Sequence, residues 1–216
     1  MTTTTVRPRR TVGADALAFA RQSWAGLRVL LVLTLVLGVG YPLAVTGLAH
    51  VLLPWQADGS LVSATGAHVT RADTGVVGSV LVGQRFDGDA WFHPRPSAAG
   101  DGYDTLASGG SQLGPLDERL LADVEQRRAA VAAAEGVDPA DVPPDALTAS
   151  ASGLDPHVSP AYARLQVPRV ARERGLPVAQ VRALVADATQ GRDLGVLGEP
   201  RVNVLLLNLA LGRAAA

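Results

Sequence analysis

The most compact group of chemically reactive residue types in this sequence surrounds Pro156. Asp155, His157 and Ser159 fall within five positions and offer the carboxylate, imidazole and hydroxyl of a hydrolase triad. Members of such triads usually converge from separate elements, whereas this stretch has the composition of a turn. Ser159 followed by proline is typical of a helix cap. We therefore expect Ser159 to be a cap, with a hydrolase as an alternative hypothesis.

Histidine spacing and charge exclude several other kinds of chemistry. The four histidines are His50, His68, His93 and His157. No two of them have the spacing of three or four residues that places two ligands on one helix face, so no metal site is expected. The sequence has no cysteine and no lysine, which excludes thiolate ligands, Walker A loops and Schiff-base chemistry. A net charge of −1 without a basic patch argues against nucleic-acid binding.

A glycine-rich loop is the better candidate for ligand binding. Residues 106–112 (LASGGSQ) loosely resemble the LSGGQ signature with which ABC ATPases contact a nucleotide phosphate. The candidate nucleotide-binding residues are accordingly Ser108, Gly109, Gly110 and Gln112. Exposed amides ahead of a helix hold anions, but Pro115 donates no N–H, and Asp117 and Glu118 would repel phosphate. We expect a packing loop, with nucleotide binding as the alternative.

One uncharged run dominates the N-terminal part of the chain. Residues 29–53 contain no Asp, Glu, Lys or Arg. A helix of this length rises roughly 37 Å, enough to cross a hydrocarbon core of about 30 Å. The rival is a cleaved signal peptide, whose apolar region is usually only about 7–15 residues. We expect a retained single span, and Pro42 beside Gly38 and Gly40 favours a helix packed against others.

The distribution of charge predicts how the span is oriented. Five Arg and one Asp precede residue 29, whereas 14 Arg and 19 acidic residues follow residue 53. The excess of basic residues places the N-terminus in the cytoplasm and the large domain outside. The expected organisation is a partly disordered cytoplasmic tail (1–28), a transmembrane helix (29–53) and one extracytoplasmic domain (54–216).

The large domain is expected to be mixed α+β, because strand-like segments come first and helical segments later. Val-rich residues 76–86 predict a buried strand, and Trp91 begins a second. Helices are expected to open at three prolines: Pro115, Pro160 and Pro177. Pro168 is expected to kink or interrupt the second helix. Residues 202–211 are apolar and fit either a strand or a helix.

Six short motifs, in order, resemble the family of C subunits of the Kdp potassium pump. They are GSVLVGQ (78–84), WFHPRPSA (91–98), SGGSQLGP (108–115), ASASGLDPH (149–157), QVPRVA (166–171) and GEPRVNV (198–204). Each motif is weak alone, but six in order behind one apolar span are specific. The sequence departs from the family at Gln112, where Asn is frequent, and at Pro144, where an apolar residue is common.

The resemblance implies an accessory subunit rather than an enzyme. Its partners would be a channel-like potassium-binding subunit, a P-type ATPase subunit and a small membrane peptide, with phosphorylation and ATP hydrolysis on another subunit. No tightly bound cofactor is implied, and ATP enters only as the nucleotide of the complex. An anchored extracytoplasmic hydrolase, or a sensor module for another partner, remains the alternative.

Two roles follow from the resemblance and leave the mechanism open. One is a catalytic chaperone that raises the ATP affinity of the ATPase subunit, and the other is a cap at the potassium entrance. An external domain cannot touch cytoplasmic ATP, so the expected orientation favours the cap and makes any effect on ATP affinity allosteric. Gln166 is a further candidate nucleotide contact, beside Arg169, although both are expected to be ordinary exposed helix residues.

Overall fold

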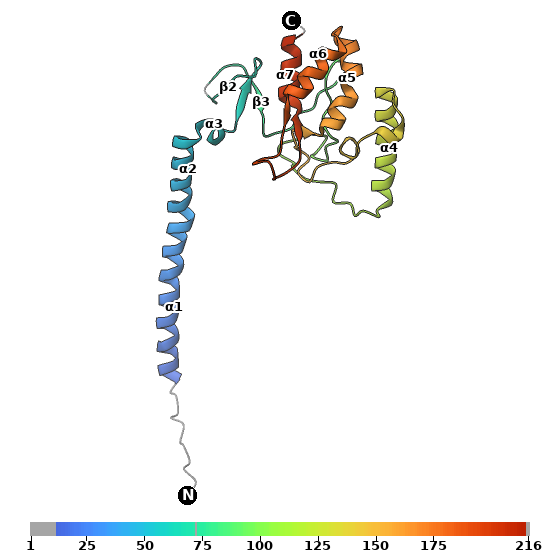
Figure 1. Ribbon diagram of the computed structural model, residues 1–216. Helices are drawn as coiled ribbons and strands as arrows, with labels where there is room; N and C mark the ends of the chain where they lie inside the picture. The colour runs from blue at the N-terminus through green and yellow to red at the C-terminus, as the bar shows by residue number, and fades with distance from the viewer. Residues whose placement is uncertain (1–11, 72, 215–216) are drawn as a thin grey trace. The chain divides into compact units, whose positions relative to one another are not determined.

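The computed structural model describes residues 12–71 and 73–214 of the chain (Figure 1). It divides into two compact units, Met1–Ala57 and Asp58–Ala216. The mixed α+β class and the single long apolar helix ahead of the domain are confirmed. Of the expected tail, residues 1–11 lie outside the described part, and residues 12–28 are helical.

The first unit is one long apolar helix with a change of hydrogen-bonding pattern in its middle. Helix α1 (Val12–Leu35) continues through a π-helical turn (Val36–Gly40) into α2 (Tyr41–Leu52), and α3 (Pro54–Ala57) follows. Pro42 has no N–H to donate to the helix. At the preceding residue, the N–H of Tyr41 bonds to the carbonyl of Val36, five residues back, which is the π-helical pattern. The segment Asp15–Leu52 has a mean hydropathy of 2.2 over its most apolar window and fits a single-pass membrane helix.

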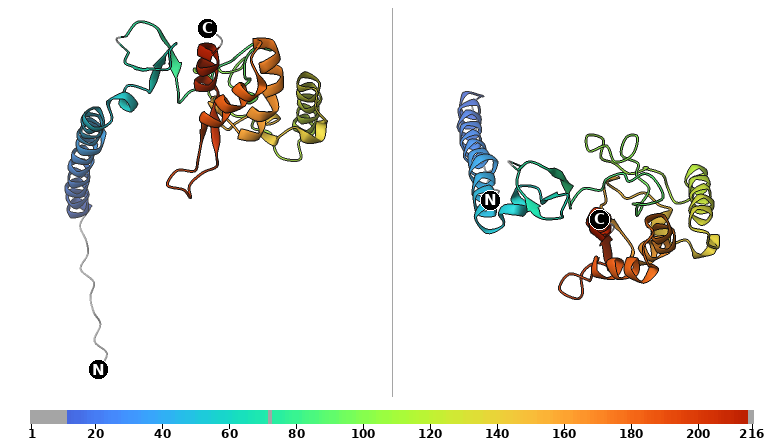
Figure 2. Two further views of the ribbon diagram at one scale, coloured as in Figure 1. Left: turned by 45° about the horizontal axis from the view of Figure 1, so that its top comes forward. Right: turned by 90° about the horizontal axis from the view of Figure 1, so that it is seen from above.

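Two small antiparallel sheets form the strand part of the second unit. In the first, β1 (Leu61–Ser63) lies between β2 (His68–Val69) and β3 (Val76–Ser79). In the second, β6 (Arg201–Asn203) lies between β4 (His157–Val158) and β5 (Thr189–Gln190). His157 pairs with Asn203, and Thr189 pairs with Val202. Because β5 and β6 form a hairpin, residues 191–200 make a connecting loop that projects from the domain (Figure 2).

Four longer helices make up most of the rest of this unit in the part of the chain that the structure describes. Helix α4 (Glu118–Glu135) is capped by Asp117, and α5 (Pro160–Arg174) is capped by Ser159, whose hydroxyl accepts from the N–H of Tyr162. Helix α6 (Val178–Asp187) and helix α7 (Val204–Ala214) complete the set, and α5, α6 and α7 lie side by side (Figure 1). Two short 3₁₀ turns, Pro139–Asp141 and Pro144–Ala146, separate α4 from β4.

The core lies between α5, α6, α7 and β6. Its fully buried members include Phe92, Val167, Val181, Val202 and Leu207. Burial of such side chains is worth about 1.5–3 kcal/mol each and is the main force that holds the helices together.

Several expected elements differ in the structure. Of residues 76–86 only Val76–Ser79 are a strand, and Val76 and Val77 are each 38% exposed rather than buried. The strand stops at Ser79 because the chain turns there, and the N–H of Val82 bonds to the carbonyl of Ser79. Gly83 then donates its N–H to the carbonyl of Leu154, where a Cβ would lie 2.6 Å from the carbonyl oxygen of Asp155.

The second expected strand is also absent among the described residues, because Trp91 and Phe92 lie in a segment held by side chains rather than by a ladder. The expected first helix begins at Glu118 rather than at Pro115. Helix α5 runs without interruption past Pro168, so the predicted interruption is wrong. Residues 202–211 are both strand and helix, since β6 ends at Asn203 and α7 begins at Val204.

Candidate functional site

The segment 89–93 leaves a turn that the N–H of Trp91 closes on the carbonyl of Gly88, enters the core at Phe92, and is fixed by side chains from two helices. Asn208 of α7 accepts from the N–H of Phe92 at 2.9 Å and donates to its carbonyl at 3.0 Å. Gln166 of α5 does the same to the next residue, accepting from the N–H of His93 at 2.7 Å and donating to its carbonyl at 3.1 Å. Each carboxamide replaces a neighbouring strand, so the backbone groups remain paired inside the core.

Arg169 completes the fixation of this segment. Its guanidinium donates to the carbonyls of Asp89 and Trp91, to Oε1 of Gln166 at 2.9 Å and to Oε1 of Glu135 at 3.0 Å. The side chains of Arg169 and Glu135 are only 2% and 3% exposed. Burial raises the pKa of Glu135 more than the adjacent guanidinium lowers it.

The expectation that Gln166 and Arg169 are exposed is therefore wrong. Gln166 is fully buried, and both ends of its carboxamide are engaged within the domain. Gln166 and Arg169 are polar residues three positions apart on one helix, and polar residues with this spacing also occur on helix faces exposed to solvent. The partners of these two residues lie 73 or more residues away at His93 and Trp91, so spacing within the helix carries no signal of burial.

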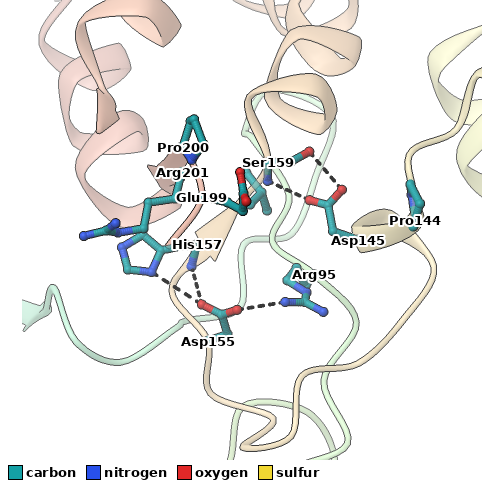
Figure 3. A pocket seen from close by; sticks show the side chains of 10 residues that line it. Arg95, Pro144, Asp145, Asp155, His157, Ser159, Glu199, Pro200 and Arg201 are labelled. Carbon is teal, nitrogen blue, oxygen red and sulfur yellow. Dashed lines mark hydrogen bonds and ion pairs between the residues drawn. The ribbon is translucent and has the colours of Figure 1, made fainter. Parts of the chain in front are cut away.

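A pocket of about 500 Å³ lies where β4, β6 and the loop before β4 meet (Figure 3). Its charged or titratable lining side chains are Arg95, Asp145, Asp155, His157, Glu199 and Arg201. Asp155 joins two of them, because its Oδ2 accepts from Nη1 of Arg95 at 2.9 Å and its Oδ1 lies 3.4 Å from Nδ1 of His157. Burial alone would raise the pKa of Asp155, but hydrogen bonds from His157 and the nearby Arg95 outweigh burial and lower it.

Ser159 is not part of a triad in this pocket. Its hydroxyl donates to Oδ1 of Asp145 at 2.9 Å and accepts from the N–H of Tyr162 at 3.0 Å. The imidazole of His157 contacts Asp155, whereas the hydroxyl of Ser159 binds Asp145, so the two groups contact different carboxylates (Figure 3). Ser159 therefore acts as the N-cap of α5, and this geometry does not support the hydrolase hypothesis.

Arg95 and Asp145 are residues that sequence reasoning missed at this pocket. Arg95 is 60 positions from Asp155, and Asp145 is 14 positions from Ser159. For Arg95 the available signal was its place in the motif 91–98 shared with the family, whereas Asp145 lies in none of the six motifs. Local spacing does not connect either residue to its partner.

The glycine-rich loop 106–112 packs against the turn that precedes β4. The hydroxyl of Ser108 and the N–H of Gly109 both donate to the carbonyl of Ser152, at 3.0 and 2.9 Å. A Cβ on Gly110 would lie 3.2 Å from the carbonyl oxygen of Ala151. Gln112 is exposed and has a φ of 56°, in the left-handed region. The structure thus brings Ser108, Gly109 and Gly110 together with residues 150–153 and leaves the side chain of Gln112 at the surface.

The contact between the glycine-rich loop and residues 150–153 leaves no room for a side chain at position 153. The φ of Gly153 is 66°, and a Cβ there would lie 2.7 Å from the Cβ of Ala99 and from the carbonyl oxygen of Gly109. Three loops therefore meet at a point with no room for a side chain. Ser97 adds a further tie, because its hydroxyl donates to the carbonyl of Gly153 at 2.6 Å.

In the part of the chain that the structure describes, no group of three or more His, Cys, Asp and Glu side chains is arranged to hold a metal ion.

A single long apolar helix followed by one α+β domain fits the class of single-pass membrane proteins. Residues 23–213 match the family model described as KdpC, the c chain of K⁺-transporting ATPases. The potassium-transporting ATPase KdpC subunit of Kineococcus radiotolerans is 60% identical over 195 residues, covering 90% of this chain and 95% of that protein. The KdpC subunits of Acidobacterium capsulatum and Mycobacterium tuberculosis are 54% and 49% identical, covering 81% and 89% of this chain and 89% and 98% of their own lengths.

The chain belongs to the KdpC family of K⁺-transporting ATPase subunits. It is accordingly an accessory subunit of a potassium-transporting ATPase complex. The resemblance drawn from the six sequence motifs is confirmed.

Proposed function

We propose that this subunit acts from outside the membrane as a cap at the potassium entrance of the complex, without binding ATP itself. Its partners would be the channel-like subunit, the P-type ATPase subunit and the small membrane peptide. Phosphorylation and ATP hydrolysis would lie on the ATPase subunit. Any chaperone-like increase in ATP affinity would then be transmitted through those partners as an allosteric effect.

The observation that supports this proposal most directly is that hydrogen-bond donors of the glycine-rich loop 106–112 are already bonded within the domain. Ser108 and Gly109 direct their polar hydrogens at the carbonyl of Ser152, which leaves those groups no hydrogen to offer a phosphate. Gln166 is equally committed to the backbone of His93. A nucleotide site at this loop would require these bonds to break.

Charge supports the same conclusion. Residues 96–118 contain four carboxylates and no basic residue. They are Asp101, Asp104, Asp117 and Glu118. The chain beyond residue 53 carries 14 Arg against 19 acidic residues, so its formal charge is −5. A negative surface raises the local concentration of a cation such as K⁺ and repels a polyphosphate.

Membrane sidedness is the first test of the proposal. The chain has no native cysteine, so Ala134→Cys on the exposed face of α4 gives one thiol for a membrane-impermeant maleimide. We expect labelling in intact cells with a permeabilised outer layer. The matched variant Ala16→Cys, on the N-terminal side of the span, should react only after lysis. The reverse pattern would place the domain in the cytoplasm and overturn the proposal.

Kinetics of the assembled pump give the second test. The triple variant Asp101→Asn/Asp104→Asn/Glu118→Gln removes three negative charges, and the carboxamide introduced at position 104 retains an oxygen to accept from the N–H of Leu106. We expect severalfold weaker apparent K⁺ affinity at low ionic strength, a smaller effect in high salt, and unchanged half-saturation by ATP. A change in ATP dependence with unaltered K⁺ dependence would contradict the cap.

A further inference from the structure

The tip of the β5–β6 hairpin concentrates apolar surface that the domain itself does not use. Leu194, Val196 and Leu197 are 91%, 74% and 57% exposed, within four consecutive positions. Both views in Figure 2 show the loop 191–200 projecting away from the helices of its own unit. Single exposed aliphatic residues are ordinary on a protein surface, but three together at a projecting tip indicate a contact surface.

The backbone at the same tip is held in an unfavourable conformation. Leu194 has a φ of 53° and precedes Gly195, whose φ is 77°. The N–H of Val196 closes this turn on the carbonyl of Asp193 at 3.2 Å. Turns with two positive φ values favour Asn or Gly at the first position, where leucine is strained by its Cβ. Leu194 therefore combines an unfavourable backbone conformation with an exposed apolar side chain. Neither feature stabilises the hairpin itself.

The hairpin is closed by its own backbone and side-chain pairs, and its four charged residues (Arg192, Asp193, Glu199 and Arg201) sum to zero. Asp193 and Leu197 exchange two backbone hydrogen bonds, each of 2.9 Å. Arg192 pairs with Glu199 at 2.7 Å, and Arg201 pairs with Asp193 at 3.2 Å. The two arginines nearest the tip are thus neutralised by the hairpin's own carboxylates. A preorganised apolar tip loses little conformational entropy on binding.

We propose that the hairpin tip docks into an apolar socket on another subunit of the same potassium-transporting ATPase complex, with Leu194 as its anchor. Membership of the KdpC family supplies the partner, because the chain is one subunit of a larger complex. Charge complementarity favours a neutral protein socket over an anionic lipid surface, which is held by unpaired Lys and Arg. A second copy of this chain is disfavoured, since a tip that enters a different surface of an identical chain makes a ring or an open-ended series of KdpC-family chains rather than a link to the other subunits.

This docking goes beyond the cap role and does not depend on it. The hairpin would engage its partner on whichever side of the membrane the domain lies. The sidedness experiment and the docking experiments therefore fail independently.

The decisive variant relieves the strain while it removes the apolar side chain. Leu194→Asn places a residue that tolerates positive φ at the tip. We expect the purified full chain to unfold at the same temperature or up to about 4 °C higher. We expect its binding to the other subunits in detergent to weaken roughly tenfold to a hundredfold, as for loss of one buried leucine. The matched control Leu194→Met keeps an apolar side chain in the same backbone conformation and should assemble almost normally. Wild-type assembly of the Asn variant would overturn the proposal, as would equal losses for Asn and Met.

Crosslinking identifies the occupant. Val196→Cys carries a benzophenone maleimide at the tip of the otherwise cysteine-free chain, and Ala134→Cys on α4 provides the matched control. In the assembled complex we expect illumination to join residue 196, in preference to residue 134, to another subunit. Crosslinks from residue 196 only to lipid, or only to a second copy of this chain, would contradict a socket on a partner subunit.

Discussion

The carboxamide of Asn208 binds both backbone groups of Phe92, across 116 positions of sequence. Phe92 is 1% exposed and Asn208 is also 1% exposed, so water cannot replace either bond. Helix α7 is thereby joined to the segment 89–93 by a pair of hydrogen bonds like those between neighbouring strands of a sheet.

Asn208→Ala should be strongly destabilising, because it leaves a buried N–H and a buried carbonyl without partners. We expect the free energy of unfolding to fall by about 2–5 kcal/mol. Urea unfolding followed by tryptophan fluorescence measures this, since Trp91 adjoins the contact. Gln180→Ala on the exposed face of α6 is the control and should change the free energy of unfolding by less than about 0.5 kcal/mol. Equal effects would show that the pairing to Phe92 contributes nothing.

Substitutions at Ser159 separate the stabilising effect of the helix cap from the repulsion between two neighbouring carboxylates. Ser159→Ala removes the cap and should cost about 1–2 kcal/mol. Aspartate is usually as good a cap as serine, but Asp145 lies within hydrogen-bond distance of the Ser159 hydroxyl. We therefore expect Ser159→Asp to be less stable than Ser159→Ala, and Asp145→Asn to restore part of the loss in the double variant. Thermal unfolding of the four chains checks the order, and a Ser159→Asp chain as stable as wild type would contradict it.

The lowered pKa of Asp155 makes a pH-dependent contribution to stability. A carboxyl whose pKa is lower in the folded chain than in the unfolded chain stabilises the fold above its unfolded value, near 3.8, and this contribution is lost as the pH falls through the folded value. The difference in urea midpoint between wild type and Asp155→Asn should thus be full at pH 7 and shrink below about pH 3.8. Asp101→Asn, at an exposed position, is the comparison. A difference that grows on acidification would reverse the assigned sign.

The membrane helix offers a prediction about assembly. A Cβ on Gly40 would meet only the carbonyl oxygen of Leu35, at an ordinary 3.8 Å, so the helix itself tolerates a larger residue. Gly40→Leu should insert normally yet copurify less well with the other subunits, because small residues allow close helix approach. Val39→Leu, one position away and on a different face, should copurify normally. Unchanged copurification of the Gly40 variant would exclude this face as a contact.

Local signals in the sequence predicted those parts of the fold that local physics decides. The Ser159 cap and the α6 start after Pro177 follow from hydrogen bonding and φ preference within a few residues. The prediction of a strand over residues 76–86 was wrong because valine content indicates only a preference for strand, whereas a turn after Ser79 ends β3.

The candidate site was less predictable because its contacts are long-range. Gln166 and Arg169 have the composition of a solvated helix face, and only the arrival of residues 89–93 buries them. The same holds for the loop at Ser108, whose partner Ser152 is 44 positions away. Family resemblance identified these positions as important, and the structure gives the physical reason.

The long span between Phe92 and Asn208 also has a consequence during protein synthesis. At about 5–20 residues per second, a ribosome needs roughly 6–23 s to translate the 116 positions between them. Until α7 emerges, Phe92 lacks its carboxamide partner and β4 lacks its neighbour β6. The nascent domain therefore cannot complete this part of its core for several seconds, and the segment around Phe92 stays without its final packing during that interval.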